Sequence, residues 1–138
     1  MKEYSIHLIG GEDDEVAKLL AETTEGKCEL TFQYRSKTIT TQDTDCFAAF
    51  CQIRKILEIE NLIPFCYGAS LNVYPSGMCR DMGSGLVAYR NEMGMQAGQG
   101  DLVRIFEEGP DVIPSTVENQ KQHHNEWLES MGYPKLAL

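Results

Sequence analysis

The chain has 138 residues, 42% of them hydrophobic and 24% charged, and a formal net charge of −9 at pH 7. Its length and composition predict one soluble globular domain over residues 1–138, and its acidity argues against direct nucleic acid binding. No hydrophobic run approaches the roughly 18 residues of a membrane span, and no signal peptide precedes the first expected strand. We therefore expect a cytoplasmic protein with no membrane partner and with five reduced cysteines.

The first forty residues combine three expected strands with one expected helix. Strict alternation of apolar and polar residues predicts strands at 4–8 and 28–34, and a tight turn should return the chain antiparallel as a strand at 38–41. After Gly10 and Gly11, four consecutive acids favour the start of a short helix, because acids suit the first turn of a helix. The apolar stripe of this helix would consist of Val16, Leu19 and Leu20.

The middle of the chain predicts a helix followed by more strands. A central helix is expected at about 44–61, capped by Asp43 or Thr44, because its apolar residues form one broad face. A long strand at 63–74 should follow it, since apolar and polar residues alternate there. Two shorter strands are expected after that, at 86–93 and 102–106.

A C-terminal helix is expected at about 115–131. Ser115 and Glu118 have the spacing of a capping box, and the Trp127 side of this helix should pack against the core. Together these elements predict an α+β fold: a mainly antiparallel sheet of five or six strands, with the central helix and the C-terminal helix packed on it.

The segment 75–100, rich in glycine and methionine, is the first candidate site. Methionine adapts to binding partners, glycine allows close backbone approach, and an arginine can grip a carboxylate or phosphate with two hydrogen bonds. The alternative is a structured loop whose methionines fill gaps in the core and whose neighbouring charges, Arg80 and Asp81, form a solvated pair. If the segment covers a ligand pocket, its lining should come from Tyr74, Met78, Arg80 and Tyr89. If it meets a protein partner instead, Met78, Arg80 and Asp81 are the expected contact residues.

A thiol enzyme is the second interpretation of the same segment. Arg80 would lower the pKa of the neighbouring Cys79, but a catalytic thiol also needs a histidine beside it. The candidates are His7, His123 and His124, and a buried, inert thiol is the alternative that we favour. Adjacent histidines on a helix point about 100° apart and do not form the i, i+4 pair that one metal needs, so neither a metal nor a cofactor is expected.

The acidic charge is concentrated at the two ends of the chain. Residues 1–26 carry a net charge of −5 and residues 106–138 a net charge of −4, whereas residues 27–105 are neutral overall. If the ends meet in the fold, they would form one negative face that steers a basic protein partner toward the molecule. The alternative is that the acidity serves solubility alone. The acids that head the two clusters are Glu12, Asp13, Asp14 and Glu15, and Glu107, Glu108 and Asp111.

In size, acidity and lack of a catalytic motif, the whole chain resembles the small cytoplasmic immunity proteins of bacterial contact-dependent and polymorphic toxin systems. Those proteins are acidic single domains, often α+β, that bind and block one toxin domain, frequently a basic nuclease. The resemblance implies a cognate toxin domain as partner, without catalysis and without a cofactor. A small enzyme or ligand-binding protein, with its pocket under the segment 75–100, remains the alternative function.

Overall fold

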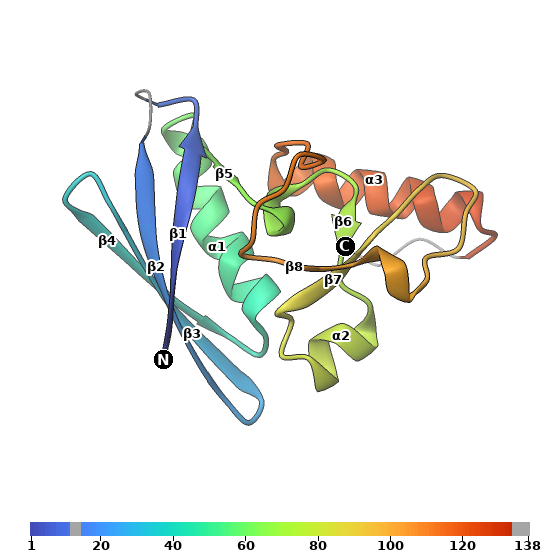
Figure 1. Ribbon diagram of the computed structural model, residues 1–138, viewed down its shortest axis with the longest axis horizontal. Helices are drawn as coiled ribbons and strands as arrows, with labels where there is room; N and C mark the ends of the chain where they lie inside the picture. Colours follow the sequence, from blue (N-terminus) through green and yellow to red (C-terminus); the bar gives the residue numbers. More distant parts are fainter. Residues whose placement is uncertain (12–14, 134–138) are drawn as a thin grey trace.

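The computed structural model describes residues 1–11 and 15–133 and has the predicted α+β fold (Figure 1). Five antiparallel strands form one sheet in the order β4-β3-β2-β1-β5, which confirms the expected antiparallel architecture. Three further strands form a second, separate sheet in the order β6-β7-β8, where one continuous sheet was expected. The strands of the first sheet are β1 (Lys2–Ile9), β2 (Val16–Thr24), β3 (Lys27–Tyr34), β4 (Lys37–Asp43) and β5 (Ile63–Phe65).

The central helix α1 (Cys46–Ile59) lies across one face of the five-stranded sheet, as predicted (Figure 1). Alternate residues of the strands point toward this helix, so that Leu30 and Phe32 are buried while their neighbours are not. The helix contributes Phe50 and Leu57, both fully buried. Burying each such side chain stabilises the fold by about 1.5–3 kcal/mol, which makes this layer the main core. No helix in the described part of the chain is long and apolar enough to cross a membrane.

The short helix expected at 12–20 is wrong in its described part, which belongs to strand β2. Leu19 is buried between two neighbours, with Tyr4 of β1 on one side and Phe32 of β3 on the other. A strand in this central position gains a hydrogen-bonded ladder on both edges, and that outweighs the local preference for a helix. The predicted acids Glu12, Asp13 and Asp14 lie outside the described residues.

The long strand expected at 63–74 is broken into two short strands of different sheets with a 3-10 helix between them. These elements are β5, the 3-10 helix η1 (Tyr67–Ala69) and β6 (Val73–Tyr74). The break coincides with Gly68, whose amide donates to the carbonyl of Ile105 at 2.7 Å. A Cβ atom at Gly68 would lie only 3.0 Å from the Ile105 side chain, so the absence of a side chain permits this close crossing.

The segment 75–85, expected to be a loop, contains helix α2 (Gly77–Met82). Ser76 caps it by accepting a hydrogen bond from the amide of Cys79, which is the usual role of serine at this position. The expected strands at 86–93 and 102–106 are present but shorter. They are β7 (Val87–Arg90) and β8 (Leu102–Arg104), separated by the 3-10 helix η2 (Gln99–Asp101).

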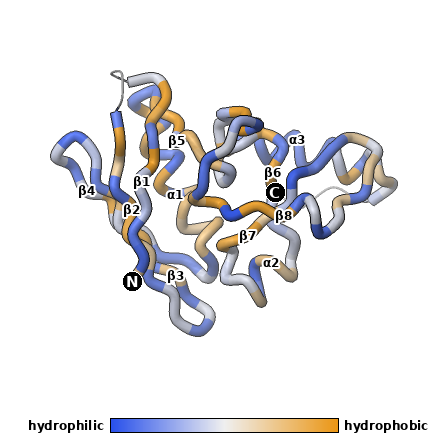
Figure 2. The backbone as a smooth tube through the Cα atoms, viewed as in Figure 1, coloured by the Kyte–Doolittle hydropathy of each residue, from blue (hydrophilic) through white to orange (hydrophobic). Residues whose placement is uncertain are grey.

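The predicted C-terminal helix is α3 (Val117–Ser130), which is largely hydrophilic, as its blue colour in Figure 2 shows. Thr116, rather than the expected pair of Ser115 and Glu118, caps it by accepting from the amide of Asn119. The Trp127 side of this helix faces inward, as predicted, since its fully buried residue, Gln120, lies on the same face. Trp127 itself is half-buried and lies outside the main core.

A buried hydrogen-bond network joins α3 to α1 and to the segment 68–73. Arg54 of α1 donates to Gln120 Oε1 at 2.6 Å and to the carbonyl oxygens of Gly68 and Ser115. Gln120 Nε2 donates in turn to the carbonyl oxygens of Gly68, Ser70 and Val73. Buried polar groups are costly unless they are paired, so this network fixes where α3 lies relative to β6.

One disulfide corrects the expectation of five reduced thiols. Cys28 of β3 is bonded to Cys46, the first residue of α1. Both are fully buried, so the bond lies inside the main core and ties the start of the helix to the sheet. Three cysteines are free, as expected: Cys51, Cys66 and Cys79.

Candidate functional site

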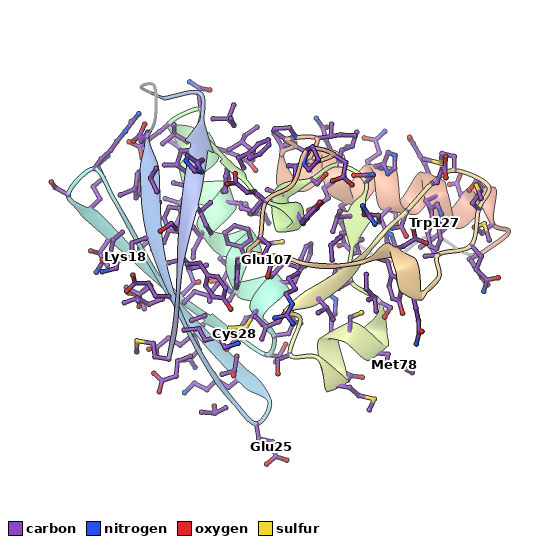
Figure 3. The ribbon with its side chains drawn as sticks, viewed as in Figure 1. Lys18, Glu25, Cys28, Met78, Glu107 and Trp127 are labelled. Carbon is purple, nitrogen blue, oxygen red and sulfur yellow. A yellow bond between two sulfur atoms is a disulfide. The ribbon has the colours of Figure 1, made fainter. Side chains whose placement is uncertain are left out.

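A cleft of about 540 Å³ lies between β6, α2 and α3. Trp127 stands on its α3 side, and α2, which carries Met78, forms another wall (Figure 3). Ligand pockets are typically about 300–1,000 Å³ in volume and are mostly apolar with a few polar groups. The residues that give this cleft its character are Tyr74, Pro75, Arg80, Lys121, His124 and Trp127.

Three rings follow one another along the cleft. The ring of His124 stacks on Tyr74 with a centroid distance of 4.1 Å and an interplanar angle of 13°. Trp127 lies one helical turn further along α3, 5.7 Å from His124 and inclined by 22°. Its indole Nε1 donates to the carbonyl oxygen of Met95 at 3.0 Å, which fixes the orientation of the ring. The cleft therefore has rigid aromatic surface before any ligand is present.

Residues at the N-terminus of α1 hold the side chain of Arg80, which belongs to α2. Its Nη1 lies 3.2 Å from Asp45 Oδ2, and its guanidinium lies over the rings of Phe47 and Tyr74 at 5.1 and 5.7 Å. Asp45, and not the expected Asp43 or Thr44, caps α1 by accepting from the amide of Ala48. The buried partner of Arg80 is thus Asp45, where the sequence suggested a solvated pair with Asp81.

The cleft has a positive electrostatic character. Among the described residues that line it, Arg80 and Lys121 carry a permanent charge and none is a carboxylate. In the part of the chain that the structure describes, Lys121 forms no ion pair. Burial, then the charge of Arg80 and then His123 lower the pKa of His124 from 6.5 to about 4, so this imidazole is neutral at pH 7.

The pocket expected under the segment 75–100 is thus present, but with a different lining. Tyr74 and Arg80 line it as predicted, whereas Met78 is 70% exposed on the outer side of α2 and Tyr89 pairs with Tyr74 in the β6–β7 ladder. Cys79 is buried, and no hydrogen bond joins it to a histidine in the described residues. The thiol interpretation therefore gains no geometric support.

The turn after α2 explains the glycines that stood out in the sequence. Gly85 has a φ of +68°, and a Cβ atom there would lie 2.9 Å from the amide nitrogen of Phe47. The carbonyl of Ser84 accepts a hydrogen bond from the amide of Cys46 at 2.8 Å. Since only glycine tolerates both this φ and this contact, the turn serves to dock α2 against the start of α1, where Arg80 meets Asp45.

The predicted acids of the C-terminal cluster each face a base. Asp111 Oδ2 lies 2.7 Å from Arg90 Nη1, and Asp111 Oδ1 accepts from Tyr67. The hydrogen bonds from Tyr67 and Arg90 hold the pKa of Asp111 below its usual value. Two looser pairs complete the cluster: Glu107 with Arg104 at 3.8 Å, and Glu108 with His7 at 3.5 Å.

The contact between Glu108 and His7 brings parts of the two acidic ends together. His7 belongs to β1, so the segment that follows β8 lies beside the strand that leads into the N-terminal acids. Glu15, the described member of that cluster, forms an ion pair with Arg35, and its carbonyl accepts a hydrogen bond from the amide of Leu8.

One further group of acids was not singled out from the sequence. Around the β2–β3 turn, the exposed Glu22, Glu25 and Glu29 form no ion pair within the described residues.

Sequence reasoning missed the α3 side of the cleft. The spacing of Lys121, His124 and Leu128 along a helix could have revealed that they share one face, but nothing in the pattern shows which element that face meets.

No group of three or more histidine, cysteine or acidic residues suited to a metal occurs in residues 1–11 and 15–133. No protein-family model and no curated protein sequence matches the chain.

Proposed function

We propose that this protein is a binding domain that neutralises a basic protein partner, as immunity proteins do with a toxin domain. The observation that carries the proposal is the contact of Glu108 with His7 at 3.5 Å. It supports the idea that acids far apart in the sequence act from one end of the molecule. A negative end of this kind accelerates association with a basic protein and makes the association rate sensitive to salt.

The contacts of the individual acids support two of them, Glu107 and Glu108, as the residues that meet the partner. Glu107 and Glu108 make long contacts with Arg104 and His7, their side chains are 59% and 52% exposed, and they can exchange these partners at little cost. Asp111 and Glu15 are engaged at 2.7 and 2.5 Å by Arg90 and Arg35. Reversing either of these would disturb the local structure, so they are poor test positions.

The test begins with a search for a toxin domain encoded beside this gene and measures its association rate with wild type and with Glu107→Lys/Glu108→Lys. We expect about a tenfold slower association at about 50 mM salt, and little difference at about 500 mM, where the charges are screened. The matched control is Glu22→Lys/Glu25→Lys, which changes the net charge equally but lies near the opposite end of β2 from Glu15. It should slow association about twofold.

Two results would contradict the proposal. If no toxin domain binds the wild-type protein, the function is wrong. If the two double variants slow association equally, the overall charge steers the partner, and the end that carries Glu107 and Glu108 has no special role.

A further inference from the structure

We propose that the cleft between β6, α2 and α3 binds a small aromatic anion, a planar ring that carries one carboxylate or phosphate group. The inference goes beyond the neutralisation of a partner protein and does not depend on it. It rests on three features of the cleft: its size, the arrangement of its rings, and the sign of its charges.

The shape of the cleft suits one planar ring. Its volume of about 540 Å³ falls within the range of small-molecule pockets. The stacked rings of Tyr74, His124 and Trp127 offer an apolar surface, and aromatic rings favour offset or edge-to-face contact with such surfaces. Because Met95 fixes the indole and the stack fixes the imidazole, a ligand would lose little affinity to the ordering of these side chains.

The charges of the cleft require the ring to be anionic. Arg80 reaches the cleft from α2 and Lys121 from α3, so two cations approach it from different elements. The contact of Arg80 with Asp45 is made by Nη1, and a guanidinium has further N–H donors for a ligand. His124 is neutral and adds no repulsion or attraction of its own at pH 7. An uncharged ring would leave Lys121 without an anionic partner and the remaining N–H donors of Arg80 unused, and a bare phosphate would leave the rings uncovered.

Binding can be followed through Trp127, the single tryptophan of the chain. We would titrate the full-length protein with 4-hydroxyphenylacetate and with adenosine 5′-monophosphate, up to about 5 mM. The matched uncharged probes are 4-hydroxyphenethyl alcohol and adenosine, and inorganic phosphate is the probe without a ring. We expect a saturable change in Trp127 fluorescence with at least one anionic probe, and binding at least about tenfold weaker for its uncharged match.

A pair of variants tests the role of charge. Lys121→Gln removes a cation from the cleft, and Lys18→Gln removes one from the outer face of the five-stranded sheet, far from Trp127 (Figure 3). We expect binding of the anionic probe to weaken about tenfold in the first variant and less than about twofold in the second. The proposal is overturned if neither anion gives a saturable signal, if the uncharged probes bind equally well, or if both variants weaken binding to the same extent.

Discussion

His124 shows how the environment of a single residue sets the character of the cleft. Its Nδ1 is buried without a hydrogen-bond partner in the described residues, and its ring is stacked on Tyr74. Burial and the nearby Arg80 disfavour the imidazolium and lower its pKa to about 4. The residue therefore contributes an uncharged aromatic ring to the cleft at neutral pH, and Arg80 and Lys121 are the cations among the described lining residues.

The low pKa of His124 predicts that stability falls as the pH decreases from 6.5 to about 4. In this window the unfolded chain takes up a proton on His124 and the folded protein does not, so each step toward acid favours unfolding. The measurement is the free energy of unfolding in urea at pH 7 and pH 5. His124→Phe, which keeps an aromatic ring, should lose this part of the pH dependence.

The matched control for that measurement is His7→Asn. His7 is exposed and lies beside Glu108, away from the cleft, so this substitution should leave most of the acid sensitivity unchanged. If wild type and His124→Phe lose the same free energy between the two pH values, His124 does not titrate in the predicted window, and burial does not govern it.

At the scale of elements, the secondary structure could be predicted where the apolar residues of a segment follow one clear periodicity. The strands β1, β3 and β4 and the helices α1 and α3 lie where alternation or a broad apolar face placed them. The segment after Gly11 fits two periods, because Val16, Leu19 and Leu20 suit a helix whereas Ala17, Leu19 and Ala21 suit a strand. Pairing with β1 and β3 decides between them, and that information lies outside the segment.

A local pattern does not show tertiary neighbours, and this explains why only the β6 and α2 side of the cleft could be predicted. Tyr74 and Arg80 belong to the segment that drew attention by its own composition. Lys121, His124 and Trp127 join them only because α3 packs beside β6, a contact between residues about fifty positions apart. The sequence predicts that the Trp127 side of α3 packs inward, but it does not show which element that side meets.

The disulfide between Cys28 and Cys46 should stabilise the attachment of α1 to the sheet. It closes a loop with a sequence separation of 18, and the entropy lost by the unfolded chain for a loop of this length is worth about 3 kcal/mol. We expect the free energy of unfolding in urea to fall by about 2–4 kcal/mol when the protein is fully reduced. The variant Cys28→Ala/Cys46→Ala should no longer respond to reductant.

Counting thiols gives an independent check of that bond. After unfolding without reductant, alkylation should modify three cysteines: Cys51, Cys66 and Cys79. In the native protein Cys66 should react slowest, since complete burial raises its pKa to about 12. Modification of all five in the unreduced protein would show that the bond does not form.

At the scale of the whole molecule, one side chain links the two sheets. Arg54 lies on the buried face of α1, since it follows Phe50 by four residues and precedes Leu57 by three. An arginine among apolar neighbours was the sign in the sequence that something polar must meet it. Through Gln120 and the carbonyl of Gly68, it connects the five-stranded sheet and its helix to the part of the molecule that holds the cleft.

Arg54→Met should therefore loosen α3 before it unfolds the five-stranded sheet. The substitution keeps an apolar stem but leaves Gln120 Oε1 and the carbonyl of Ser115 without their donor, at about 1–3 kcal/mol for each group. The removal of a buried charge offsets part of that cost. Trp127 fluorescence reports on α3, and far-UV circular dichroism reports on the whole fold. We expect the fluorescence transition in urea to occur at a lower urea concentration than the dichroism transition.

The matched control is Lys55→Met, one position along α1 and exposed. It should leave the two transitions coincident and the free energy of unfolding within about 0.5 kcal/mol of wild type. Coincident, unshifted transitions in Arg54→Met would mean that packing alone holds α3 in place.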